Sequence, residues 1–153
     1  MAKIERKYMA HYLQVGEEIV RLGTDLEEYS PELSAQVEKT KNILGQTSVN
    51  IVGYEKSASV EPYYAQEGDP LFQKLQEIID GDLVLENCLV QVIEVKLWQG
   101  SEGAFPAIRE KAYIEVTSYG GDTTGYQIPF TLHYTGIKES GTFDVVAKTF
   151  TPA

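Results

Sequence analysis

The sequence has 153 residues, of which 42% are hydrophobic and 24% are charged, and these proportions are typical of a single globular domain. Its 23 acidic residues against 13 lysines and arginines give a formal net charge of -10, which disfavours tight phosphate binding by the surface as a whole. The single cysteine, Cys88, excludes an internal disulfide framework and leaves too few thiolates for structural zinc. No apolar run of membrane-spanning or signal-peptide length occurs, so we expect a protein that folds in a cytoplasm without membrane insertion.

Apolar residues alternate in the first third of the chain, which indicates β-strands. Residues 8–15 and 18–22 are expected to form a hairpin around Gly16, and residues 33–37 are a weaker strand candidate. Residues 47–54 carry apolar side chains on both faces, which predicts a strand covered by its own core and by a neighbouring subunit. The flanking segments 38–45 and 55–61 are charged, serine-rich or marked by glycine, and we expect both to be projecting loops.

One helix is predicted at residues 69–81. Asp69 is a good N-cap, Pro70 suits the first helical position, and Gly81 stands just past the end. Apolar side chains recur at helical spacing on one face, at Leu71, Phe72, Leu75, Ile78 and Ile79. The helix is therefore expected to lie with this stripe against a sheet.

Alternation returns after the helix and predicts four more strands, at residues 89–98, 112–119, 128–134 and 142–150. Turns are expected at 100–103, 120–122 and 138–141, where glycine is present. Pro129 within the third of these strands favours an edge position or a bulge. The chain as a whole therefore reads as mainly β with one helix.

The sequence offers no recognisable catalytic or metal-binding motif. Its two histidines, His11 and His133, both fall in predicted strands, where packing or hydrogen bonding is the usual role. Asp80, Asp82 and Glu86 resemble a calcium loop only faintly, and a helix end with a solvated turn explains them better. We therefore expect no enzyme activity, no cofactor and no metal.

Tyrosine is abundant, with ten residues that include the adjacent pair Tyr63 and Tyr64. Aromatic rings with one polar end suit a β-sheet core or a wet subunit interface. A platform for stacking a sugar or a nucleotide is the alternative interpretation.

Several longer stretches resemble phage tail tube proteins of the siphophage kind. They are residues 110–130 (EKAYIEVTSYGGDTTGYQIPF) and the later pieces HYTG, GTF and TFTP, which begin at His133, Gly141 and Thr149. Residues 37–45 (VEKTKNILG) and 60–72 (VEPYYAQEGDPLF) look like the same family's loop and helix entry. The resemblance thus covers nearly the whole chain.

This resemblance implies one tail tube domain over residues 1–153, an antiparallel β-sandwich or half-barrel with a flanking helix at about 69–81. It further implies a projecting loop at about 38–46 and terminal arms at about 1–7 and 149–153 that order on neighbouring subunits. Six copies would form a ring in which sheets continue between subunits, and rings would stack helically into a conduit for DNA. Tape measure, tail terminator and distal tail proteins would be partners in a virion assembled in the host bacterial cytoplasm.

Candidate functional residues follow from this expectation. A lumen lined by carboxylates repels phosphate and lets DNA pass without specific binding, and the lumen candidates beside long strands are Glu38, Glu55, Glu115 and Asp122. Contacts between rings or subunits are expected at Lys39, Lys41, Asn42, Ile43, Leu44, Tyr63 and Tyr64.

Two alternatives stay open at the level of sequence. A contractile-tail or secretion-type tube protein would share the same ring logic. A carbohydrate-binding β-sandwich module would explain the tyrosines and Trp98, and a stable monomer with saturable sugar binding would favour it.

Overall fold

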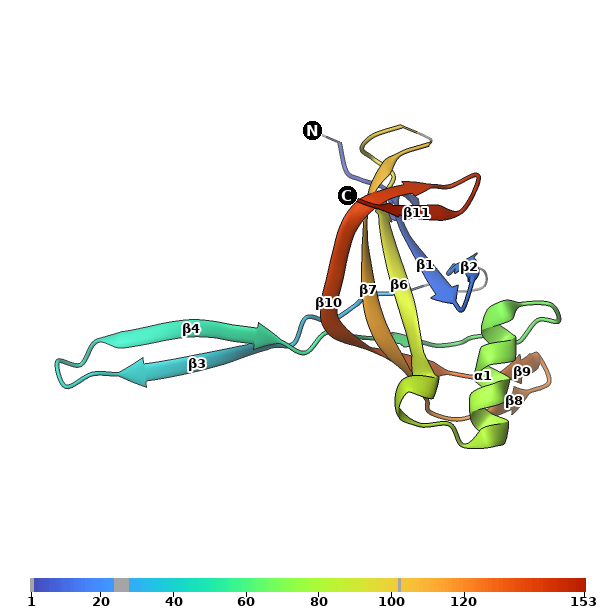
Figure 1. Cartoon of the computed structure of the whole chain (residues 1–153). Coiled ribbons are helices and arrows are strands. Elements are labelled where there is room, and N and C mark those ends of the chain that lie inside the picture. The colour runs from blue at the N-terminus through green and yellow to red at the C-terminus, as the bar shows by residue number, and fades with distance from the viewer. Residues whose placement is uncertain (1, 24–27, 102) are drawn as a thin grey trace.

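A strongly curled antiparallel sheet forms the body of the protein in the computed structural model, which describes residues 2–23, 28–101 and 103–153 (Figure 1). Its strands follow the order β11-β10-β7-β6-β1-β2, and β5 pairs with the edge of β10 that β7 leaves open. Their bounds are β1 (Met9–Val15), β2 (Glu18–Arg21), β5 (Ser57–Val60), β6 (Leu89–Lys96), β7 (Phe105–Val116), β10 (Phe130–Asp144) and β11 (Thr149–Pro152).

The remaining elements lie outside this sheet. Two separate hairpins are formed by β3 (Ala35–Lys41) with β4 (Thr47–Tyr54) and by β8 (Gly120–Asp122) with β9 (Gly125–Gln127). The helices among the described residues are one α-helix, α1 (Pro70–Gly81), and two 3-10 turns, Arg6–Tyr8 and Leu85–Cys88. The predicted fold class, a mainly β half-barrel with one flanking helix, is therefore confirmed.

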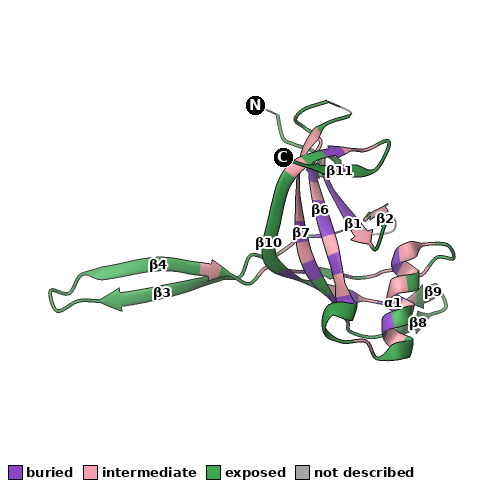
Figure 2. Cartoon of the chain, in the orientation of Figure 1, coloured by how far each residue is buried: buried purple, intermediate pink, exposed green. Residues whose placement is uncertain are grey.

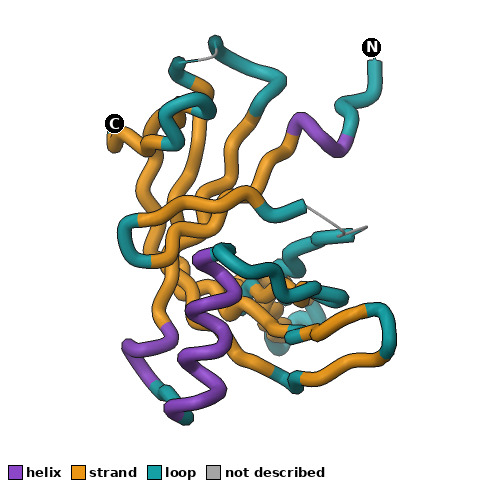
Figure 3. The backbone as a smooth tube through the Cα atoms, turned by 90° about the vertical axis from the view of Figure 1, so that its right-hand side faces the viewer, coloured by secondary structure: helices purple, strands orange, loops and turns teal. Residues whose placement is uncertain are grey.

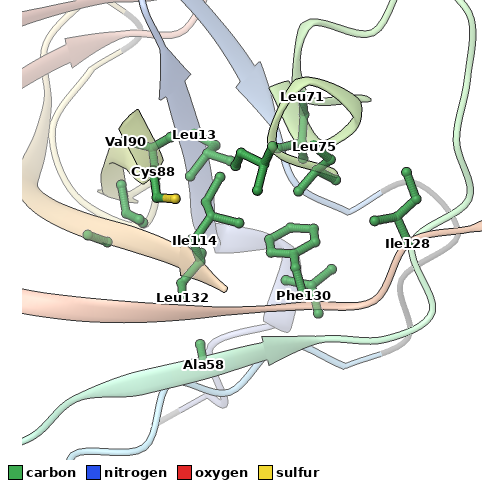
Figure 4. Packing of buried hydrophobic residues seen from close by; sticks show 14 of the residues in the cluster. Leu13, Ala58, Leu71, Leu75, Cys88, Val90, Ile114, Ile128, Phe130 and Leu132 are labelled. Carbon is green, nitrogen blue, oxygen red and sulfur yellow. The ribbon is translucent and has the colours of Figure 1, made fainter. Parts of the chain in front are cut away.

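Helix α1 forms where capping and apolar spacing favour it. The Asp69 carboxylate accepts a hydrogen bond from the Leu71 N–H at 3.0 Å, and Pro70 occupies the first turn. Leu71, Leu75 and Ile78 are buried against the sheet, and each stabilises the fold by about 1.5–3 kcal/mol. Figure 3 shows the helix lying alongside the sheet, and Figure 4 shows Leu71 and Leu75 facing Leu13, Ile114 and Phe130.

The sheet is buried on both faces, because neighbouring residues of a strand point to opposite sides. Leu13 and Val92 belong to the cluster beneath α1, whereas the adjacent Tyr12 and Ile93 belong to a second cluster. The curled end of β10 and β11 covers this second cluster, where the rings of Tyr12 and Phe143 lie 4.6 Å apart. Along β6 the buried positions alternate but change face between Val92 and Ile93, where one cluster gives way to the other (Figure 2).

The C-terminal half differs from the sequence prediction. Residues 128–134 and 142–150 were expected to be separate strands around a turn at 138–141, but β10 runs without a turn from Phe130 to Asp144. The twelve-residue strand β7 pairs with nearly all of it, and a bulge between Tyr134 and Lys138 absorbs the irregularity. The chain reverses later, where the Asp144 carboxylate accepts hydrogen bonds from the N–H groups of Val146 and Ala147.

Residues 55–61 and the two expected terminal arms also differ from the sequence prediction or add structure to it. Residues 55–61 were expected to form a loop, but most of them form β5, whose Ala58 and Val60 are buried. The expected C-terminal arm contains β11, which pairs with β10 and buries Phe150. In the expected N-terminal arm, residue 1 lies outside the described residues and Arg6–Tyr8 forms a 3-10 turn.

Candidate assembly interface

The β3–β4 hairpin projects from the body of the protein as a long arm (Figure 1). Its seven-residue first strand spans about 24 Å at roughly 3.4 Å per residue. Every residue of β3 is exposed, and in β4 only Gly53 is half-buried (Figure 2). The expectation that residues 47–54 are covered by their own core is therefore wrong, because this strand lies away from the core and pairs only with β3.

The two faces of the arm differ in chemistry. Residues directly opposite each other in an antiparallel pair share a face, and the register pairs Val37 with Ile51 and Lys39 with Val49. The arm's apolar face thus carries Val37, Val49 and Ile51, which are 51%, 58% and 59% exposed, and also the two lysines Lys39 and Lys41. The opposite face, called the polar face, carries Glu38, Thr40, Ser48 and Asn50, while Val52, which is 60% exposed, lies near the root at the bulge where the register shifts.

A compact turn closes the arm at residues 42–46. The Asn42 side-chain oxygen accepts hydrogen bonds from the N–H groups of Leu44 and Gln46, at 2.9 and 3.0 Å. Gly45 has φ of +80°, a left-handed conformation that favours glycine. This ordered turn holds Ile43 and Leu44 in solvent, with Ile43 fully exposed and Leu44 77% exposed.

The root of the arm is tied to the sheet by a buried ion pair. Lys56 stands between β4 and β5, and its Nζ lies 3.2 Å from Glu110 Oε1 and 3.6 Å from Glu94 Oε1. The same ammonium group lies 4.5 Å from the centre of the Tyr134 ring. Glu110 is 3% exposed and also accepts the Gly136 N–H at 3.0 Å. Because both partners of the Lys56–Glu110 pair are largely buried, breaking it would leave an unpaired charge inside the protein.

The two strands of the arm meet the body through further hydrogen bonds. Glu32 and Ser57 exchange backbone hydrogen bonds of 2.7 and 3.0 Å, and the Glu55 N–H donates to the Ser34 carbonyl at 3.3 Å. The hydroxyl groups of Tyr29 and Tyr134 lie 2.6 Å apart, and burial raises the pKa of both. The backbone ladder of the arm therefore leads into β5 and the main sheet.

His11 belongs to this buried root. Its Nδ1 has no hydrogen-bond partner among the described residues and lies 3.9 Å from Glu94 Oε1. Burial, with a smaller contribution from the positive charges of Arg6, Lys56 and Arg21, lowers the pKa of His11 to about 4. The imidazole is therefore neutral near pH 7 and acts as a packed residue of the core.

The four lumen candidates lie on separate parts of the protein, and all four are exposed. Glu38 is on the polar face of the arm, and Glu55 at its root accepts a hydrogen bond from the Gln36 side-chain amide at 2.7 Å. Glu115 in β7 pairs with His133 in β10 at 2.9 Å. Hydrogen bonds from the side chain and backbone of Thr124 hold the pKa of Asp122, in β8, below its usual value.

The predicted contact residues divide into two groups. Lys39 and Lys41 lie on the arm, and Asn42, Ile43 and Leu44 form its tip. Tyr63 lies instead in the body, where its hydroxyl donates to Asp69 Oδ2 at 2.5 Å and its ring packs edge-on against Phe130. Tyr64 makes an isolated backbone bridge to Gln127 and is half-buried.

Sequence reasoning missed the buried root, although the pattern contained a signal. Glu94 continues the face of β6 that holds Val90 and Val92, and Glu110 stands two residues before the buried Ala112. A carboxylate on an otherwise apolar face indicates a buried partner of opposite charge. The identity of that partner, Lys56, could not be read from sequence, because the pairing depends on the tertiary fold.

Metal-binding and membrane-spanning features are absent from the described ranges. No group of three or more histidine, cysteine, aspartate or glutamate side chains is placed to hold a metal ion there. Within the same residues, no helix has the length and apolar character needed to cross a bilayer.

Comparison with solved structures identifies a likeness in fold. No family model and no curated protein matches the sequence. The cryo-EM structure of the anti-feeding prophage cap, a tube terminating cap, is similar to this chain with a TM-score of 0.59 and 11% sequence identity. The match covers 93% of this chain and 93% of the cap, so the likeness extends over both proteins nearly from end to end. At this identity it shows that the two chains share a fold.

Proposed function

We propose that this protein is a structural subunit of a bacteriophage-type tail tube, in which copies of the chain form rings that stack helically. The observation that carries the proposal is the arm, a long β-hairpin with apolar side chains that none of the described residues of its own chain covers. The fold shared with a tube terminating cap supports it. A structural role without catalysis or cofactor follows from the same proposal.

Assembly would bury the side chains that the isolated subunit exposes. Full burial of an aliphatic side chain contributes roughly 1.5–3 kcal/mol, so Val37, Val49 and Ile51 together can drive association. The formal charge of -10 on each copy opposes that association through mutual repulsion. Salt screens repulsion between exposed charges, and assembly should therefore be favoured as ionic strength rises.

The tube would conduct DNA without binding it specifically. The carboxylates proposed to face the lumen are Glu38, Glu55, Glu115 and Asp122, which are all exposed on the subunit. A wall of negative charge repels phosphate oxygens, and DNA would slide past it. The tape measure, tail terminator and distal tail proteins are the proposed partners in a virion that assembles in the host bacterial cytoplasm.

A cap at the end of a tube is the second candidate function. It is favoured by the printed role of the similar structure, which is a tube terminating cap. A cap subunit would form closed rings that do not elongate, whereas a tube subunit would form tubes of many rings. Assembly products therefore separate the two candidates directly.

Negative-stain electron microscopy of the purified protein, across a series of protein and salt concentrations, tests the proposal. Long hollow tubes support the tube subunit and isolated rings support the cap. The variant Val49→Asp, which places a charge on the apolar face, should abolish assembly. Asn50→Asp is its matched control, because this neighbouring residue is also exposed but lies on the polar face. A protein that stays monomeric in every condition would contradict both candidates.

A further inference from the structure

A broad open groove lies at the end of the sheet where α1 and β7 finish. Its volume is about 1360 Å³, and it is lined by the end of α1, by the loop 82–88 and by the end of β7 with residues 117–119. Several of its apolar side chains are open to solvent, with Val84, Leu85 and Tyr119 exposed by 62%, 79% and 64%. An apolar surface of this kind is typical of an interaction site.

The loop that presents these side chains is held in place by hydrogen bonds. The Leu83 N–H donates to the Ile78 carbonyl at 3.2 Å, and the Asn87 N–H donates to the Val84 carbonyl at 3.2 Å. The Lys74 ammonium donates to the Asn87 carbonyl at 2.6 Å. Val84 and Leu85 are therefore displayed by an ordered segment, which favours docking because little conformational entropy is lost on binding.

Charge identifies the kind of partner that the groove fits. The loop 82–88 contributes two acidic residues to the lining, Asp82 and Glu86. A suitable partner would combine projecting apolar side chains with neighbouring positive charge. The tip of the arm has this composition, because the exposed Ile43 and Leu44 follow Lys39 and Lys41 within a few residues.

We propose that the arm tip of one copy, residues 41–46, docks in the groove of a second copy. Ile43 and Leu44 lie against Val84 and Leu85, and Lys41 lies beside Glu86. The arm extends away from the end of the body that carries the groove, so a subunit does not fill its own groove (Figure 1). Because the tip and the groove are different surfaces of the subunit, each copy can dock its tip in one neighbour while its groove receives the tip of another. Such a heterologous contact therefore repeats along the assembly. This inference rests on the proposed self-assembly and names the two surfaces that meet.

Disulfide trapping tests the contact in assembled protein. Cys88 lines the groove and donates its S–H to the Leu83 carbonyl at 3.3 Å, so Cys88→Ser provides a background with no cysteine that keeps this donor. In that background, Ile43→Cys with Leu85→Cys should give a ladder of cross-linked dimers, trimers and higher species on mild oxidation. The matched control combines Ile43→Cys with Val146→Cys, an 81% exposed residue in the turn between β10 and β11 (Figure 1). It should give at least tenfold less cross-linked product.

Charge reversal tests the same contact without cysteine. Lys41→Glu and Glu86→Lys should each reduce the assembled fraction several-fold, and the double variant should restore at least half of it. The proposed docking is overturned if the Cys88→Ser protein assembles but the variant with Ile43→Cys and Leu85→Cys cross-links no better than the variant with Ile43→Cys and Val146→Cys. It is equally overturned if the double charge reversal restores nothing. Either result leaves the proposed function standing, whereas a parent protein that never assembles overturns both.

Discussion

Replacement of Lys56 by methionine should destabilise the protein strongly, because it leaves Glu110 buried without its ion-pair partner. At 3.2 Å and an effective dielectric constant of about 20, the attraction between these two charges is about 5 kcal/mol. Desolvation offsets much of that attraction in the intact pair, but removal of one partner exposes its cost. With Lys56 14% and Glu110 4% exposed at the side chain, we expect a loss of about 3–5 kcal/mol.

Denaturant unfolding followed by circular dichroism, at a protein concentration where the chain is monomeric, measures this loss directly. The midpoint of thermal unfolding should fall by roughly 10 °C. The double variant Lys56→Met with Glu110→Gln should recover a large part of the stability, because the most deeply buried charge is removed and only Glu94, 20% exposed at the side chain, still lacks the ammonium group. Lys39→Met, at an exposed lysine of the arm, is the matched control and should change stability by no more than about 0.5 kcal/mol. A loss below about 1 kcal/mol for Lys56→Met would refute the reasoning.

Three further predictions concern the interior. The pKa of His11 is about 4 in the folded protein and 6.5 in its ordinary state, so between these pH values the unfolded chain binds a proton that the folded protein does not. The free energy of unfolding is therefore highest above pH 6.5 and falls by about 3 kcal/mol towards pH 4. In pH-dependent unfolding, His11→Gln should lack this part of the slope, and an unchanged slope would contradict the assignment. Leu75→Ala, at a fully buried position of α1, should lower the free energy of unfolding by about 2–5 kcal/mol. Gln73→Ala, on the exposed face of α1, should lower it by less than about 0.5 kcal/mol, and equal losses in denaturant unfolding would argue against the packing described. Tyr29→Phe should cost about 1–3 kcal/mol because the Tyr134 hydroxyl loses its partner, and the doubly substituted protein should be no less stable than the single variant if this hydrogen bond is the cause.

Local rules predicted the parts of the fold that local chemistry determines. Asp69, Pro70 and the apolar spacing of α1 fix the helix within its own segment, and the opening strands around Gly16 follow in the same way. The C-terminal strands were harder, because residues 138–141 with Gly141 indicate a turn unless the long partner β7 is known. Pairing with a distant strand overrode the local signal there.

The arm shows a different limit of sequence reasoning. Apolar residues on both faces of 47–54 indicated a strand covered on both sides. Residues 35–41 are mostly polar, so the sequence did not identify them as the strand that pairs with 47–54. The apolar pattern of a sequence reflects every surface that a protein buries, and in the proposed assembly this includes surfaces buried against other copies. Val49 and Ile51 therefore read as interior residues while they stand in solvent on the isolated chain.

In the assembly proposed above, the anchored root of the arm would set the entropy cost of bringing two subunits together. A flexible tether would let the tip sweep a large volume, and each docking event would have to select one orientation from many. This arm leaves the body through the Glu32–Ser57 bridge and the buried Lys56, and its strands are paired along their length. Its orientation is thus settled during folding, before any partner arrives. Most of the ordering entropy belongs to the folding of the monomer, so in the proposed assembly even a modest contact at the tip would be enough to add the next subunit.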